Sequence, residues 1–225
     1  MTGQKAVNAI RVIKKDKTYY IYNDAEYLGG IYRRDFEKLG IITVIELDKL
    51  CDASADDKKI SEFYIENVSD DKLIAIRDEV INKGFNKSVA LATARECSAD
   101  VIRTKLKLKK YPDSAIDAVI ELMYSYNYIN DERFVEAYVR SYMMSKSRRM
   151  IEMELEDRGI DVSRYGEVID TVYLDENVDT ETVVKELLRK KYGNDDLSDE
   201  RIKRRAAAYL HRHGFGYDVI KLYLT

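Results

Sequence analysis

Histidine and cysteine are the residue types best suited to hold a metal ion or to act as nucleophiles, and this chain has two of each. His211 and His213 are two residues apart, so they project from different faces of a helix, whereas helical metal-ligand pairs lie three or four residues apart. Cys51 and Cys97 stand alone, without a CxxC motif or a histidine nearby in sequence. We interpret the histidines as part of a basic helix end and the cysteines as reduced thiols of a cytosolic protein.

Pairs of carboxylates could support acid–base catalysis, and the sequence has three adjacent aspartate pairs, at 56–57, 70–71 and 195–196. Their turn-like surroundings are typical of solvated loops or of acids at helix N-termini rather than of a two-carboxylate site. The sequence also has no P-loop, dinucleotide-binding, zinc-protease or nucleophile-elbow motif. We therefore predict that this protein is not an enzyme and that it uses no cofactor and no metal.

The remaining candidates for chemistry are cations, which can bind phosphates or acidic partners. The net charge is −3 and the sequence pI about 5.6, so no overall positive field draws the chain to DNA. Residues 103–110 and 137–151 nevertheless carry cations and no acid, whereas residues 152–181 are strongly acidic. Two interpretations stay open for the basic blocks: solvated helix faces, or patches that face a charged partner. The candidate partner-binding or DNA-binding residues are Arg103, Lys107, Lys110, Arg148, Arg149, Arg204, Arg205 and Arg212.

Arg148 and Arg149 follow Ser147 at the start of a predicted helix, where the positive end of the helix dipole disfavours cations by a few tenths of a kcal/mol. A bound phosphate or acidic partner would explain their position. Alternatively, they pair with downstream acids, Glu152 in particular, as surface ion pairs that contribute little to stability.

The first 65 or so residues predict a small antiparallel sheet. Short runs rich in β-branched and aromatic residues are separated by the turn signals Asn23-Asp24 and Gly29-Gly30, which predicts two to four strands. A short helix is expected near residues 33–39, and residues 41–67 fit either a strand or a helix. No apolar stretch reaches the length of a membrane span, and the N-terminus lacks the apolar core of a secretory signal.

From Ser69 onward the hydrophobic period changes to the 3.6 residues of a helix, and a pattern repeats three times. The aligned positions are Tyr111, Ile160 and Phe215, each preceded by a predicted helix-ending residue and, five positions earlier, by a leucine. The helix-ending residues are Lys110, Gly159 and Gly214, and the leucines are Leu106, Leu155 and Leu210. The third repeat fits the other two if six residues are inserted in the polar loop 192–197. Each repeat predicts three helices with one shared core. The first helix contributes Phe85 and Val89 in the first repeat, Phe134 and Tyr138 in the second, and Val183 and Leu187 in the third.

We therefore predict a mainly α protein, a tandem array of three three-helix units preceded by a small α+β N-terminal domain with a short antiparallel sheet. The predicted helix N-caps are Ser69, Ser98, Asp113, Asn130, Ser147 and Ser198. The predicted domains are a β-containing domain at 1–68, a linker helix with helical unit one at 69–128, unit two at 129–177 and unit three at 178–225.

The repeats and the residues around them contain four motifs: Arg95-x-x-Ser98-x-x-x-Ile102-x-x-x-Leu106-x-x-x-Lys110-Tyr111, Asn130-Asp131-Glu132-Arg133-Phe134, Ile151-x-x-x-Leu155-x-x-Arg158-Gly159-Ile160 and Arg205-x-x-x-x-Leu210-x-x-x-Gly214-Phe215. These motifs resemble those of the RecX family, the regulators of the RecA recombinase. The resemblance covers about residues 85–225. Two departures occur: position 96 is Glu where the family often has Pro, and position 110 is Lys where Gly is usual. Residues 42–62 look like an insertion.

The resemblance implies a non-enzymatic regulator whose partner is the RecA nucleoprotein filament on single-stranded DNA. Members of the family lodge in the helical groove of the filament and block its growth or promote its disassembly, which modulates recombination, DNA repair and the SOS response. For this chain we expect a cytoplasmic monomer without membrane association, with weak binding to single-stranded DNA alone. A generic helical-repeat adaptor or a nucleic-acid-binding module stays the alternative.

Overall fold

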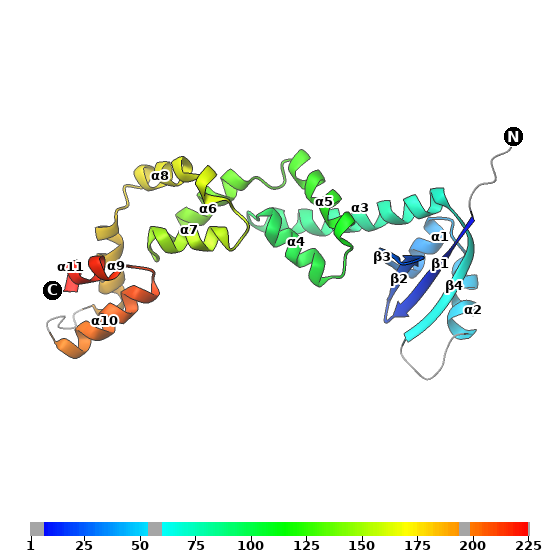
Figure 1. Ribbon diagram of the computed structural model, residues 1–225, viewed down its shortest axis with the longest axis horizontal. Helices are drawn as coiled ribbons and strands as arrows, with labels where there is room; N and C mark the ends of the chain where they lie inside the picture. Colours follow the sequence, from blue (N-terminus) through cyan, green and yellow to red (C-terminus); the bar gives the residue numbers. More distant parts are fainter. Residues whose placement is uncertain (1–6, 54–59, 194–198, 225) are drawn as a thin grey trace. The chain divides into compact units, whose positions relative to one another are not determined.

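The computed structural model describes residues 7–53, 60–193 and 199–224, which form two compact parts (Figure 1). The N-terminal part comprises Met1–Arg95 and Ile102–Tyr128, and the C-terminal part comprises Glu96–Val101 and Ile129–Thr225. Within the described ranges, no helix has the length and apolar character needed to cross a membrane.

A four-stranded antiparallel sheet opens the N-terminal part, in the strand order β3-β2-β1-β4. Its strands are β1 (Val7–Lys15), β2 (Thr18–Asn23), β3 (Glu26–Tyr32) and β4 (Ile60–Ser69). Asp16 and Asp24 take positive φ values of 55° and 51° in the two tight turns, a conformation that aspartate tolerates better than most residues. The predicted sheet is confirmed, and the ambiguous segment 41–67 contains both a helix and the edge strand β4.

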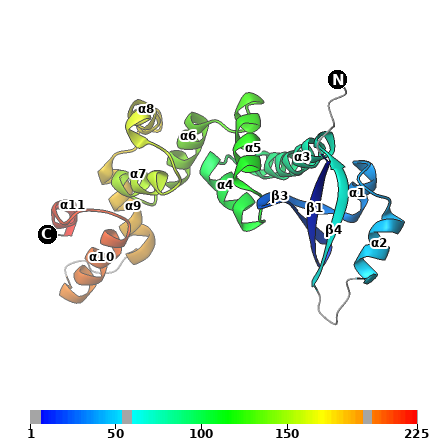
Figure 2. The same ribbon diagram turned by 45° about the vertical axis from the view of Figure 1, so that its right-hand side comes forward.

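Helices cover one face of this sheet. Those of the N-terminal part are α1 (Arg33–Lys38), α2 (Val44–Ala53), α3 (Asp70–Ala94), α5 (Asp113–Ser125) and, from Ile102 onward, α4 (Ala99–Leu108), whose first three residues belong to the C-terminal part. Helices α1, α2 and α3 contact the strands (Figure 2). Alternate strand residues such as Val12 and Ile21 are fully buried in one core cluster with Phe36, Leu47 and Ile76 of the helices. The period of two in the strands therefore leaves the other face of the sheet free of this core.

The C-terminal part contains two successive three-helix bundles, each with its own hydrophobic core. The first consists of α6 (Asp131–Tyr142), α7 (Arg148–Glu156) and α8 (Gly166–Asp175), the last preceded by the short 3-10 helix η1 (Val162–Arg164). The second consists of α9 (Thr180–Tyr192), α10 (Glu200–Arg212) and α11 (Tyr217–Leu224). The predominantly helical fold is thus confirmed, whereas the domain boundaries given above stay predictions.

The three predicted repeats end their second helices in the same way. Lys110, Gly159 and Gly214 have positive φ values of 58°, 77° and 87°. After each of them, the next backbone N–H donates to the carbonyl of the repeat leucine, at 3.1 Å for Leu106, 3.1 Å for Leu155 and 3.2 Å for Leu210. These are Schellman motifs, in which a left-handed residue lets the chain satisfy helix-terminal carbonyls. The leucines themselves are at most 1% exposed.

The first helix of the first repeat is placed differently from the sequence expectation. Phe85 and Val89 align with buried residues of the later repeats, but both are only half-buried, and Gly84 and Ser88 occupy the buried face instead. The reason is that α3 is a single helix of 25 residues whose first half packs on the sheet, which sets the rotation of its second half. The Phe85 ring lies beside the rings of Tyr126 and Tyr128, with centroids 5.7 and 5.8 Å away.

The predicted N-caps are partly confirmed. Asn130 and Ser147 cap α6 and α7 through their side chains, which accept from the backbone N–H groups of Arg133 and Met150. Asp113 is instead the first residue inside α5, whose N-cap is Pro112, because proline suits a position with no hydrogen-bonded N–H. Ser198 lies outside the described residues.

Serine N-caps and left-handed glycines interlock in the C-terminal part. The Ser98 hydroxyl donates to the carbonyl of Arg158 at 3.0 Å, and the Ser147 hydroxyl donates to the carbonyl of Gly214 at 2.7 Å. A Cβ on Gly159 would lie 2.9 Å from Cβ of Asp100, and a Cβ on Gly214 would lie 2.5 Å from Cβ of Met150. Glycine is therefore required at both positions by the close approach of the capped helix as well as by the positive φ.

In the first repeat the left-handed position is occupied by Lys110 rather than by glycine, because the group that bonds its carbonyl is a long tyrosine side chain rather than a short serine side chain. Its carbonyl accepts a hydrogen bond of 2.7 Å from the hydroxyl of Tyr27, a side chain of β3 rather than the first turn of a helix. Because the tyrosine side chain is longer than serine, the backbone of β3 lies farther from Lys110 than a serine-capped helix lies from Gly159 or Gly214. This larger separation leaves room for the lysine side chain.

We expect Gly214→Ala to lower the free energy of unfolding by about 2 kcal/mol or more. Alanine is strained in the left-handed backbone conformation, and its Cβ would also clash with Met150, so the two costs add. Chemical denaturation followed by circular dichroism measures this. Gly40→Ala is the matched control, because Gly40 also has a positive φ of 62° but no atom of the described residues lies within 4 Å of the position that its Cβ would take. Equal losses in the two variants would show that the close approach contributes nothing.

Candidate phosphate-binding surface

The predicted cations of α4 are engaged by the neighbouring helix. Arg103 pairs with Asp117 at 2.7 Å and Lys107 pairs with Asp113 at 3.3 Å, and both acids belong to α5. Lys110 lies just beyond α4, with its Nζ 5.6 Å from the centroid of the Tyr20 ring. The acid-free stretch in sequence is therefore not acid-free in space, because acids of α5 partly neutralise Arg103 and Lys107.

Arg148 and Arg149, adjacent in sequence, have different surroundings. The guanidinium of Arg148 pairs with Glu152 at 2.7 Å and also with Asp170 of α8. Burial opposes its charge, but the hydrogen bonds that it donates to these two carboxylates outweigh burial and raise the pKa of Arg148. Arg149 is exposed and makes no ion pair with any residue in the described ranges. The ion-pair alternative therefore describes Arg148, and only Arg149 of the two has a free guanidinium for a partner.

Helix α10 carries a row of exposed arginines. Arg201, Arg204, Arg205 and Arg212 follow the spacing i, i+3, i+4 and i+11, which places them on one side of the helix, opposite the buried Ala206. None of the four side chains forms an ion pair with a described residue. We call these four residues the α10 arginine stripe. Arg201 was missed by the sequence analysis, although its position one turn before Arg205 could have indicated it.

The first turn of α7 meets the end of α10. The backbone N–H of Ser147 donates to the carbonyl of His213 at 2.8 Å, next to the Ser147–Gly214 hydrogen bond, and a ring nitrogen of His213 contacts the carbonyl of Ser145. Arg149 and the α10 arginine stripe therefore come from two elements joined at this point (Figure 1). The α10 arginine stripe is the candidate phosphate-binding surface, and Arg149 is a further candidate on the helix that meets the end of α10, because guanidinium groups without carboxylate partners among the described residues are suited to bind phosphate oxygens.

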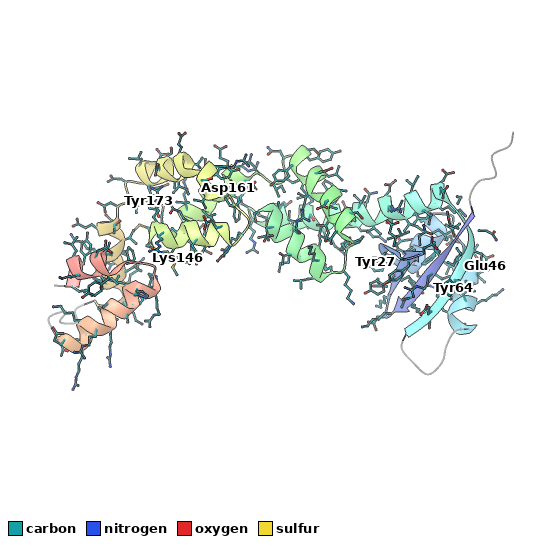
Figure 3. The ribbon with its side chains drawn as sticks, viewed as in Figure 1. Tyr27, Glu46, Tyr64, Lys146, Asp161 and Tyr173 are labelled. Atoms are coloured by element: carbon teal, nitrogen blue, oxygen red, sulfur yellow. The ribbon has the colours of Figure 1, made fainter. Side chains whose placement is uncertain are left out.

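Lys146, another cation of the block 137–151 and labelled in Figure 3, is part of a hydrogen-bonded cluster. Its ammonium donates to the Glu154 carboxylate at 2.6 and 2.7 Å, and the Tyr138 hydroxyl donates to the same carboxylate at 2.5 Å. The Arg158 guanidinium lies over the Tyr138 ring, 4.7 Å from its centroid. Burial would raise the pKa of Glu154, but the hydrogen bonds from Lys146 and Tyr138 outweigh it and lower that pKa. This cluster links α6 to α7 and presents no free cation.

The residues considered for metal binding do not come together. The described ranges contain no group of three or more histidine, cysteine, aspartate or glutamate residues placed to hold a metal ion. His211 is exposed, and His213 contacts the Ser145 carbonyl. Cys51 and Cys97 are both buried. Of the aspartate pairs, 56–57 and 195–196 lie outside the described residues, and 70–71 begins α3.

Comparison with known proteins identifies related chains. Residues 130–163 match the family model described as RecX, second three-helix domain, and residues 179–224 match RecX, third three-helix domain. The regulatory protein RecX of Bacillus velezensis is 32% identical over 142 residues, which cover 62% of this chain and 53% of the relative. The chain thus spans about half the length of the Bacillus relatives that it matches.

A second relative matches over nearly its whole length. The regulatory protein RecX of Caldanaerobacter subterraneus subsp. tengcongensis is 26% identical over 214 residues, 94% of this chain and 95% of the relative. A crystal structure titled regulatory protein RecX superimposes with a TM-score of 0.51 at 17% identity, and covers 96% of this chain and 98% of that one. At this identity the superposition shows a shared fold.

We expect Glu154→Gln to destabilise the protein by about 1–3 kcal/mol at pH 7, because the ionised carboxylate accepts the hydrogen bonds of Lys146 and Tyr138. The pKa of Glu154 is lower in the folded chain, so its stabilisation is present above the unfolded pKa of about 4.3 and is lost as pH falls through the folded value. Urea titrations at pH 7 and near pH 3 should show the difference between variant and wild type shrinking in acid. Glu167→Gln, at an exposed glutamate of α8, is the control, and a pH-independent difference at Glu154 would contradict the assignment.

Proposed function

Since this chain belongs to the RecX family of regulatory proteins, we propose that it binds the RecA recombinase filament on single-stranded DNA and inhibits the growth or activity of that filament. It acts without catalysis and modulates recombination and DNA repair. The observation that carries the proposal in this chain is the α10 arginine stripe with Arg149, a cluster of guanidinium groups for which the described residues supply no carboxylate.

The chemistry of such a filament suits this surface. A nucleoprotein filament presents DNA phosphates bordered by protein side chains, and arginine binds phosphate oxygens through two parallel N–H groups. Contacts of this kind need no particular base sequence, which fits a regulator of a filament that assembles on any sequence. Their strength falls with salt, because each phosphate contact releases counterions.

The rest of the charge pattern limits binding to DNA alone. The net charge is −3, Arg103 and Lys107 are paired with acids of α5, and Arg148 is paired with two carboxylates. Three of the predicted cations are therefore partly neutralised, and the proposal assigns the larger share of affinity to contacts with the recombinase itself. Two modest sets of contacts on one filament reinforce each other through effective concentration.

The direct experiment is co-sedimentation of the protein with recombinase filaments on single-stranded DNA, beside bare DNA of the same length. We expect the protein to sediment with filaments at concentrations where bare DNA retains little of it. Equal retention by bare DNA would indicate a nucleic-acid module, and retention by neither would indicate an adaptor for another protein.

We expect the triple variant Arg149→Glu, Arg204→Glu and Arg205→Glu to bind filaments at least tenfold more weakly, most visibly at low salt, with an unchanged melting temperature. All three side chains are exposed and make no described ion pair, so their replacement removes no contact of the fold. The readouts are co-sedimentation and suppression of recombinase ATP hydrolysis.

Arg189→Glu is the matched control, because Arg189 is an equally exposed arginine of the same part that is already paired with Glu186 at 2.8 Å. We expect it to retain filament binding. A triple variant that suppresses ATP hydrolysis at wild-type concentrations would remove this surface from the proposal.

A further inference from the structure

The helix-free face of the sheet carries most of the aromatic residues of its strands. Val12, Ile21 and Leu28 point into the core, so their neighbours Arg11, Tyr22 and Tyr27 point to the opposite face. The strand pairing confirms a continuous row, since Tyr22 lies opposite both Tyr27 of β3 and Arg11 of β1, and Arg11 lies opposite Tyr64 of β4. Tyr27 and Tyr64 mark this row on the sheet in Figure 3.

Three of these tyrosine rings gather at a hollow of about 230 Å³. The ring centroids of Tyr22 and Tyr27 are 5.1 Å apart, and those of Tyr20 and Tyr27 are 6.3 Å apart. Ile13, Lys15 and Lys110 complete the lining. The hollow is smaller than the 300–1,000 Å³ usual for small-molecule sites, so it suits one planar ring rather than a large ligand.

Two cations near this hollow lie within cation–π distance of its tyrosine rings. The Nζ of Lys110 lies 5.6 Å from the Tyr20 centroid, and the guanidinium carbon of Arg11 lies 4.7 Å from the Tyr22 centroid. Lys15 is exposed at the rim. Of the acids on the same face, Glu62 belongs to the far edge strand β4 and pairs with Arg11 at 3.6 Å. The hollow itself is lined by two cations and no acid.

We propose that this hollow binds a base of single-stranded nucleic acid, stacked on the tyrosine rings, with Lys15 and Lys110 beside the flanking phosphates. Every base has a flat π face, and aromatic residues accompanied by cations form the usual non-specific surface for unpaired nucleotides. The inference goes beyond the proposed function, because it assigns the N-terminal part a nucleic-acid contact that needs no recombinase.

The combination of aromatic and cationic side chains in the hollow favours an unpaired nucleic-acid strand over an apolar protein segment as its ligand. An apolar protein segment would gain nothing from Lys15 and Lys110, whose charges it would have to desolvate. A duplex keeps its bases stacked inside and offers only phosphates to the cations. An unpaired strand satisfies both the rings and the cations, and DNA and RNA strands share this chemistry.

The test measures fluorescence anisotropy of a labelled 12-nucleotide thymidine strand, without recombinase, against an abasic strand of equal length, a duplex and a uridine strand. We expect the wild type to bind the thymidine strand more tightly than the abasic strand and the duplex, and the uridine arm shows whether ribose is accepted. The double variant Tyr20→Leu with Tyr22→Leu should bind at least fivefold more weakly, the factor that corresponds to about 1 kcal/mol of lost stacking.

The matched control is Tyr217→Leu, which removes a ring that is 79% exposed on α11 and away from the sheet. Lys15→Gln with Lys110→Gln should instead lower the salt dependence, by a slope of about 0.7 for each cation lost. Photocrosslinking of the wild type with a 5-iodouracil strand, followed by peptide mapping, avoids dependence on the fold of any variant, and we expect crosslinks within residues 18–32.

Wild-type binding that is absent, equal for abasic and thymidine strands, or unaffected by the double tyrosine variant would overturn the proposal. Crosslinks confined to α10 would do the same. Because recombinase is left out, these results are independent of filament binding: a protein that fails to co-sediment with filaments could still bind the strand through Tyr20 and Tyr22.

Discussion

The left-handed residue that ends the second helix of each repeat is the constraint on which the helical architecture depends. At Gly159 and Gly214 the chain reverses sharply, returns a backbone N–H to the repeat leucine, and lets the first turn of another helix approach within contact of the glycine backbone. A side chain at either position would meet that helix. One backbone conformation therefore closes each of these leucine-centred cores and also provides the contact surface for the serine-capped second helix of the preceding repeat.

The contact between serine-capped helices and left-handed glycines also affects where the cations lie. It brings the start of α7, which carries Arg149, to the end of α10, which carries Arg212 of the arginine stripe. Elsewhere the helix packing places acids of one helix beside cations of another, as in Arg103 with Asp117 and Arg148 with Asp170. The cations that remain without carboxylates are thus selected by packing, and they are the groups available to a polyanionic partner.

The two faces of the sheet also have different roles. Its inner residues close a core with α1, α2 and α3, and its outer residues assemble tyrosines with Arg11, Lys15 and Lys110. The hydroxyl of Tyr27 also holds the carbonyl of Lys110, the left-handed residue of the first repeat. Burial, and after it the neighbouring tyrosines, raises the pKa of Tyr27, which keeps the phenol neutral. A side chain that supports the fold thereby also forms part of the hollow on the free face.

By itself, the sequence determined the repeat, the buried leucines and the helix-ending positions, because hydrophobic period and left-handed residues are local signals carried by residues close together along the chain. It also indicated the strands, although not which alternative the segment 41–67 adopts, since a short apolar run suits either a strand or a helix until its neighbours are known. Only the tertiary structure decided which cations are free. Arg103 and Arg148 are neutralised by acids 14 and 22 residues away on other helices, and Phe85 lost its expected buried place because the sheet sets the rotation of α3. The tyrosine hollow likewise exists only once the strands pair, because strand register, which no single strand encodes, brings Tyr20, Tyr22 and Tyr27 together.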